Sequence, residues 1–206
     1  MAFTKFKSLA DVLRHYRISY LKQSFEITKS SQASDSLKEE IRFNMEEIAY
    51  DVSEAALCEF IINPVLRAAW KPYTDVLAFW VRQPIQYDDE LTGIPDYMFS
   101  KRSELGKIIF ETPYVAVVEA KKDDFTGGWA QCALEMYAIQ KINADDNLPI
   151  FGIVTNGDIW EFGKLEGSLF VEYEDKYVLK DIDTIISALT SILEFYKQLF
   201  KQLQTN

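Results

Sequence analysis

The segment YVAVVEAKK, residues 114–122, constrains the fold of this chain more than any other stretch. Up to Ala120 it is apolar apart from Glu119, and Lys121 follows directly. A continuous apolar run of this length is typical of a strand buried on both faces. Burying a charge is costly unless the charge is paired or bound to a metal. A central strand that ends in Glu119 and Lys121 therefore indicates a paired or ligand-binding site at its end.

The pattern around this strand predicts a mixed α/β protein. Apolar spacing predicts a helix over residues 8–27, with Ser8 as its N-cap, and a second over 37–62 that breaks near 51–53 and is interrupted at Asn63-Pro64. Strands are predicted within 75–89, 93–100 and 107–120 as an antiparallel meander. A helix over 127–144 follows, then a hairpin over 149–165 that turns at Asn156-Gly157, and further β structure over 168–179.

Length and composition are those of one globular domain, residues 1–206. The chain is 48% hydrophobic, which is enough for a large core, and 26% charged. Cys58 and Cys132 lack the spacing of metal ligands and are expected to be buried free thiols. The C-terminal amphipathic helix, residues 181–203, carries one apolar stripe. That stripe is interpreted as core or, alternatively, as the surface for a homodimer or another protein partner.

Charge is divided unevenly along the chain. The net charge is −10, but residues 1–30 hold six basic and two acidic side chains, which gives +4 there and −14 elsewhere. The N-terminal basic helix and linker, residues 1–35, is thus a candidate for phosphate contact through Arg14, Arg17 and Lys22, with a solvated helix face as the alternative. No apolar run is long enough for a membrane span, so a cytoplasmic location without a membrane partner is expected.

Three residues at this strand end suit phosphodiester chemistry. Residues two apart on a strand share a face, so Glu119 and Lys121 are neighbours. Asp96 lies on the preceding predicted strand, at the end of TGIPD, and pairing of the two strands would bring it alongside. Two carboxylates and the Ala120 carbonyl are hard oxygen ligands suited to Mg²⁺, or to Mn²⁺ in its place. Lys121 can orient or deprotonate an attacking water, or stabilise charge on the phosphoryl oxygens.

Other common catalytic arrangements are excluded by the residues present. His15 is the only histidine, so neither a Ser-His-Asp triad nor an HExxH zinc site is available. The glycines of FTGGW lack the lysine and spacing of a phosphate-binding loop. A second Glu-x-Lys triplet, Glu174–Lys176, lies in a polar stretch without an apolar strand before it or a partner aspartate.

The quoted motifs resemble the PD-(D/E)XK nuclease superfamily, which has the restriction-endonuclease-like fold. The matching pieces are IPDY with Asp96, VVEAKK with Glu119 and Lys121, and the helix GGWAQCALEMYAI with Gln131. IVTNGDIWEF and SEAALCEFIINPVL are similar to segments of the nuclease domain of type I restriction enzyme motor subunits and their stand-alone homologues. The resemblance covers about residues 50–165, the expected nuclease-like core.

The resemblance implies a role for each matched residue. Asp96, Glu119 and the Ala120 carbonyl would bind Mg²⁺, and Lys121 would act on the attacking water. Gln131 would orient a phosphate or a metal-bound water. Glu54, with Glu59 as its rival, would act on the metal through water or steady Lys121. Lys122 is a further candidate for nucleic-acid contact.

The expectation is therefore an α/β protein: a restriction-endonuclease-like mixed β-sheet core flanked by helices, with extra N- and C-terminal helices. Its expected function is that of a Mg²⁺-dependent nuclease hydrolysing phosphodiester bonds of DNA. The alternative is a catalytically silent module that binds nucleic acid or protein, as a subunit of a restriction or defence complex.

Overall fold

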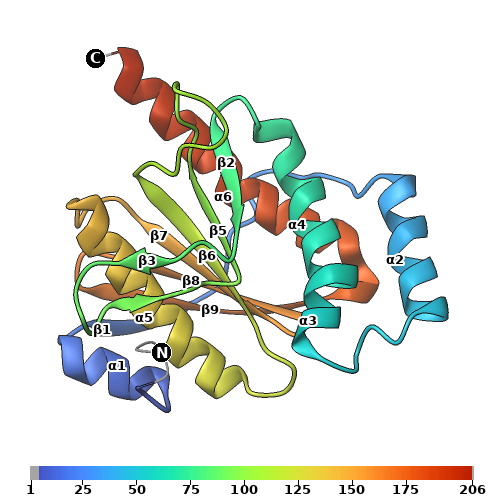
Figure 1. Ribbon diagram of the computed structural model, residues 1–206, viewed down its shortest axis with the longest axis horizontal. Helices are drawn as coiled ribbons and strands as arrows, with labels where there is room; N and C mark the ends of the chain where they lie inside the picture. Colours follow the sequence, from blue (N-terminus) through green and yellow to red (C-terminus); the bar gives the residue numbers. More distant parts are fainter. Residues whose placement is uncertain (1–4, 206) are drawn as a thin grey trace.

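The computed structural model describes residues 5–205, which form a seven-stranded mixed sheet covered by helices (Figure 1). The strand order is β1-β9-β8-β7-β6-β5-β2. These strands are β1 (Ser19–Gln23), β2 (Leu77–Val81), β5 (Tyr97–Lys101), β6 (Tyr114–Ala120), β7 (Ile150–Thr155), β8 (Ile159–Glu166) and β9 (Leu169–Val178). β6 pairs with β7 in parallel, as β1 does with β9, and the remaining pairs are antiparallel. The predicted mixed sheet flanked by helices is confirmed.

A small hairpin and nine helical segments complete the fold. The hairpin joins β3 (Ile85–Gln86) to β4 (Thr92–Gly93), between β2 and β5. Within residues 5–205 the helical segments are α1 (Leu9–Tyr16), α2 (Asp35–Glu47), α3 (Glu54–Leu57), the π-helical η2 (Cys58–Ile62), α4 (Asn63–Trp70), η3 (Lys71–Tyr73), α5 (Phe125–Asn143), η4 (Leu179–Asp181) and α6 (Ile182–Thr205). In Figure 1, α5 covers one face of the sheet with α1 packed against it, and α4 and α6 cover the other.

β6 is buried along its whole length because helices cover both of its faces. On the α5 side, a Cβ at Gly152 of the neighbouring β7 would meet the sulfur atoms of Met136 and Cys132. On the other side, Ala116 lies among Leu189 and other apolar residues of α6. The prediction of a central strand buried on both faces is therefore confirmed.

The apolar stripe of α6 belongs to the core. Its buried members are Ile182, Ile185, Ile186, Leu189, Ile192, Leu193, Tyr196 and Phe200. The Tyr196 hydroxyl donates to the Val115 carbonyl at 2.9 Å, which fixes the helix to β6. This stripe is not exposed for the expected homodimer or protein partner. Among residues 5–205, no helix combines the length and the apolar character that a bilayer crossing requires.

The first predicted helix is wrong in its second half. α1 ends at Tyr16, because Arg17 adopts a left-handed conformation with φ of 56° and caps it. Residues 19–23 then form β1, a fully exposed strand that pairs in parallel with β9. Hydrogen bonding to a distant strand overrode the local helical spacing of Tyr16 and Tyr20.

The predicted interruption at Asn63-Pro64 is also wrong. The helix does restart where expected, with the Ser53 hydroxyl accepting from the Ala56 amide. It then continues through η2 into α4. Proline lacks the N–H that would bond to the carbonyl four residues earlier. That carbonyl, of Phe60, instead accepts from the Asn44 side-chain amide at 2.7 Å, so the helix passes Pro64 without an unsatisfied group.

Most of the remaining elements follow the prediction, but two strands begin later than predicted. The strand predicted from residue 93 begins only at Tyr97, so Asp96 directly precedes it. Residues 107–113 are irregular, and β6 begins only at Tyr114, because Pro113 cannot donate to a ladder. The Asn156-Gly157 hairpin forms: Asn156 Oδ1 accepts from the Asp158 and Ile159 amides, and Gly157 has a φ of +84°. Both cysteines are buried and free, as expected.

Candidate functional site

The carboxyl end of β6 presents a buried glutamate and a lysine side by side. Glu119 is only 2% exposed, and its Oε1 accepts a hydrogen bond from the Lys121 ammonium at 2.5 Å. Its other oxygen, Oε2, is buried and has no hydrogen-bond partner among residues 5–205. An unsatisfied buried carboxylate oxygen is rare because it costs stability, so it calls for a ligand or a function.

Asp96 joins this pair from the neighbouring strand. It immediately precedes β5, which runs antiparallel to β6, so the start of β5 lies beside the end of β6. Asp96 Oδ2 accepts from the Ala120 amide at 3.0 Å, and Oδ1 lies 3.6 Å from the Arg82 guanidinium. The predicted convergence of Asp96, Glu119 and Lys121 is thus present, with Asp96 adjacent to the Ala120 peptide.

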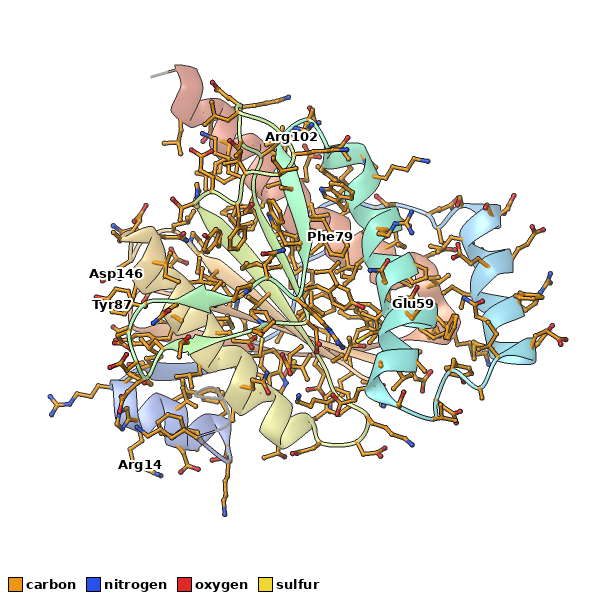
Figure 2. All side chains as sticks on the ribbon, viewed as in Figure 1. Arg14, Glu59, Phe79, Tyr87, Arg102 and Asp146 are labelled. Atoms are coloured by element: carbon orange, nitrogen blue, oxygen red, sulfur yellow. The ribbon has the colours of Figure 1, made fainter. Side chains whose placement is uncertain are left out.

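Glu54 reaches the same lysine from the other side. It is the first residue of α3, where the Ser53 cap sets the direction of the helix. Its Oε2 lies 4.0 Å from the Lys121 ammonium, and its side chain is half exposed. Glu59 is exposed and forms no ion pair or hydrogen bond within the described residues (Figure 2). Of the two glutamates left open by the sequence, Glu54 is the one near Lys121.

The start of α5 lies close against this strand end. A Cβ at Gly128 would lie 2.8 Å from Val154 Cγ1 and 2.9 Å from Lys121 Cγ, so only glycine allows this approach. The close approach brings the next turn of α5, with Gln131, toward the carboxylates. Gln131 is half-buried, and its amide nitrogen donates to Glu135 Oε1 at 3.2 Å.

Glu135 is a residue that sequence reasoning missed. It is completely buried on α5, and its Oε2 has no hydrogen-bond partner. Burial raises the pKa of its carboxyl, and the negative charge of Glu119 raises it further. The signal was available, because Glu135 is the only charged residue in the apolar run CALEMYAI, residues 132–139.

The pKa values at the site are shifted by burial and by the short distances between its carboxyl groups and Lys121. Burial raises the pKa of Glu119 to about 8, with a further contribution from Asp96 that Lys121 partly offsets. Burial of Lys121 lowers its pKa, but the negative charges of Glu119, Glu54 and Asp96 together outweigh this and leave the pKa raised. Lys121 therefore stays an ammonium near neutral pH.

The residues present fit a hard divalent cation in part. Glu119 Oε2 is an unpartnered oxygen, and Asp96 supplies a second carboxylate beside the Ala120 peptide. Within residues 5–205 no group of three or more histidine, cysteine or acidic side chains is placed to hold a metal ion. Mg²⁺ commonly keeps several waters and uses only one or two protein carboxylates. The donor set therefore suits Mg²⁺ better than a metal that needs a full cage of protein ligands.

The basic residues proposed for nucleic-acid contact lie apart from this cluster. Arg14 pairs with Asp11 at 3.2 Å, and Lys22 lies 3.5 Å from Glu172. Arg17 forms the C-cap of α1. None of the three contacts the residues around Glu119, whereas Lys122 follows Lys121 directly and is exposed.

An open groove lies elsewhere on the molecule. Its volume is about 670 Å³, and it lies between α2 and the start of α6. It contains none of the residues predicted from the sequence. The candidate site is thus identified by its buried charges and not by a deep cavity.

Comparison with known proteins gave no assignment. The chain matches no protein-family model, and no curated protein is significantly similar to it. The resemblance to the nuclease superfamily therefore continues to rest on the motifs themselves and on their geometry.

Proposed function

We propose that this protein is a Mg²⁺-dependent nuclease that hydrolyses phosphodiester bonds of DNA, with a restriction-endonuclease-like fold. One observation carries the proposal: Asp96, Glu119 and Lys121 meet at the end of a central strand, where Glu119 Oε2 is buried without a partner. The mixed sheet with helices on both faces is compatible with that fold. Fold similarity by itself does not establish a reaction.

Each residue then has a role that follows from its surroundings. Asp96, Glu119 and the Ala120 carbonyl would hold Mg²⁺, or Mn²⁺ in its place. When bound, the cation would offset the carboxylate charges, polarise the phosphodiester and acidify a bound water.

Lys121 acts as a hydrogen-bond donor in this proposal. Its pKa is raised by the neighbouring carboxylates after the opposing effect of burial, so it keeps its proton at neutral pH. An ammonium orients the attacking water or stabilises charge on the phosphoryl oxygens, and does not abstract a proton. Glu54, at 4.0 Å, steadies Lys121, and Gln131, held by Glu135, orients a phosphate or a water.

The test is cleavage of plasmid and single-stranded DNA with Mg²⁺ or Mn²⁺ by the wild type and by Lys121→Ala. Activity that is lost in the variant supports the nuclease and its site together. Equal cleavage by both proteins contradicts the assignment of the catalytic site to Lys121 and its neighbours. No cleavage by either, with both folded, favours the second candidate.

That second candidate is a catalytically silent module that binds nucleic acid or protein, as a subunit of a restriction or defence complex. It is favoured by the engagement of both Asp96 oxygens and by the absence of a three-ligand metal group within residues 5–205. Calorimetric titration with Mg²⁺ separates the two candidates. Mg²⁺ binding that disappears in Asp96→Ala counts against a silent module.

A further inference from the structure

Arg82 is a cation at the edge of the candidate site that the proposed mechanism does not use. It follows β2 directly, and its backbone amide donates to the Asp96 carbonyl at 3.0 Å. Its guanidinium lies 3.6 Å from Asp96 Oδ1, and 57% of its side chain is exposed. Arg82 therefore contacts Asp96 and also interacts with the Cys58 thiol, while more than half of its side chain faces solvent.

The backbone of Arg82 is held in an unusual conformation at this point. Its φ is 50°, in the left-handed region that favours glycine or asparagine. The chain leaves β2 here, passes through the β3–β4 hairpin and returns at Asp96. An exposed ion pair contributes little to stability, so pairing with Asp96 alone does not account for an arginine at this position.

The charge balance of the site supplies a reason. Asp96, Glu119, Glu54 and Glu135 are acidic, and Lys121 is already bound to Glu119. A nucleic-acid strand brings one negative charge with each phosphate, and phosphates on either side of the scissile one must also be neutralised. A guanidinium has five N–H donors arranged as a fork that fits phosphate oxygens. The contacts to Asp96 and to the Cys58 thiol leave other donors of the partly exposed guanidinium for such a group.

We propose that Arg82 binds a phosphate of the nucleic-acid strand next to the scissile phosphodiester. Asp96 then has two contacts that orient the strand end: its Oδ2 accepts from Ala120, and its Oδ1 orients the Arg82 guanidinium. This inference rests on the proposed function, because it concerns the same site and the same substrate class.

The experiment measures DNA binding in a chelator, so that neither cleavage nor metal affinity enters the result. Fluorescence anisotropy follows a short labelled duplex between about 50 and 200 mM salt. The variants are Arg82→Ala, Arg82→Lys and Arg82→Gly. Glycine adopts the left-handed conformation without steric cost, so Arg82→Gly is expected to fold even if alanine is strained there.

Arg102→Ala is the matched control. Arg102 is also an exposed arginine beside the β2–β5 ladder, but it follows Lys101 at the opposite end of β5 from Asp96 and donates to the Thr74 carbonyl (Figure 2). The Arg102→Ala substitution removes the same charge as Arg82→Ala. Comparison of the two variants therefore separates the loss of a local phosphate contact from the change in net charge.

Arg82→Ala and Arg82→Gly are expected to weaken binding roughly tenfold. Both should reduce the slope of log affinity against log salt by about one, the value for one lost phosphate contact. Arg82→Lys should keep the slope, because an ammonium still neutralises the phosphate. Arg102→Ala should bind as the wild type does.

Several results would overturn the inference. If Arg82→Ala and Arg82→Gly keep the wild-type affinity and salt slope, the inference about Arg82 is contradicted. The proposed function still stands in that case if the wild type cuts DNA and Lys121→Ala does not. An equal loss in Arg102→Ala, or a loss of slope in Arg82→Lys, also contradicts the inference. A folded wild type that neither binds nor cuts DNA contradicts both the inference and the proposed function.

Discussion

Two buried glutamates of the sheet, each paired with a lysine, differ in whether both of their carboxylate oxygens have partners. In the first pair, Glu119 of β6 contacts Lys121. In the second, Glu161 of β8 pairs with Lys176, which lies opposite it on β9. Both glutamates are buried. Glu161 has both oxygens satisfied, because Trp129 Nε1 donates to the oxygen that Lys176 does not contact. Glu119 has one oxygen without a partner.

The difference separates a structural ion pair from a candidate site. A buried carboxylate with every oxygen satisfied is explained by its own hydrogen bonds and needs no ligand. A buried carboxylate oxygen without a partner lowers stability, and a chain keeps such a group where a ligand satisfies it. The pair that contributes less to stability is therefore the better functional candidate.

The same comparison explains the second Glu-x-Lys triplet. Glu174 accepts from the Ser24 hydroxyl, and Lys176 contacts Glu161 on the adjacent strand and not Glu174. The triplet is thus part of the structural pair. The expectation that no apolar strand precedes it is wrong, because Phe170, Val171 and Tyr173 of the same strand β9 are buried. The contacts of the side chains, and not the strand context, separate the two triplets.

The largest expected effect is on catalysis. If the proposed function holds, Lys121→Ala should lower the rate of DNA cleavage by about 10²-fold or more, because it removes a donor at the reacting phosphate. Lys176→Ala should leave the rate near the wild-type value. The measurement is the initial rate of plasmid nicking with Mg²⁺. Equal losses in the two variants would remove the functional distinction between the pairs.

The second effect is on stability and runs in the opposite direction. Glu161→Gln should lower the free energy of unfolding by about 1–3 kcal/mol, because it disrupts a satisfied buried network. Glu119→Gln should be neutral or stabilising, because it removes a buried anion. Urea denaturation at pH 8.5, just above the raised pKa of about 8, measures both. A larger loss in Glu119→Gln would mean that the Lys121 bond outweighs the cost of the unpartnered oxygen.

The third effect is a pH dependence of stability that Glu119 should produce. Burial, and then Asp96, raises the pKa of Glu119 from 4.5 to about 8. The folded state thus holds a proton that the unfolded state releases. The resulting stabilisation is complete below about pH 4.5 and is lost as the pH rises through about 8. Glu119→Gln should flatten the fall in unfolding free energy across this window. Parallel curves for wild type and Glu119→Gln would contradict the raised pKa.

The smallest effect concerns the second carboxylate near Lys121. Glu54→Gln should lower the cleavage rate only several-fold, because Glu54 is half exposed and lies 4.0 Å from the ammonium, where ion pairs are weak. Glu59→Gln, on the next turn of the same helix, is the matched control and should have no effect. Comparison of the two rates at fixed Mg²⁺ checks this, and an effect of Glu59→Gln alone would reverse the assignment of the two glutamates.

Much of the candidate site was predictable because it depends on local pattern. The apolar run before Glu119 indicated a central strand, and alternation placed Glu119 beside Lys121. Antiparallel pairing of consecutive strands then brought Asp96 alongside. Glu135 was overlooked although it is the single charge in an apolar run, because its role depends on how α5 packs against β6. Arg82 was missed because its role depends on the return of the chain at Asp96.

By itself, the sequence determined the elements whose signals are strong and local: the buried strand β6, the Asn156-Gly157 hairpin, helix α5 and the amphipathic helix α6. Only the tertiary structure decided that residues 19–23 pair with β9, that Asn44 lets the helix pass Pro64, and that Glu54 and not Glu59 faces Lys121. The physical reason is the same in each case. A strand partner, a donor for a free carbonyl and a neighbour for a charge all come from residues far along the chain, and local periodicity carries no information about them.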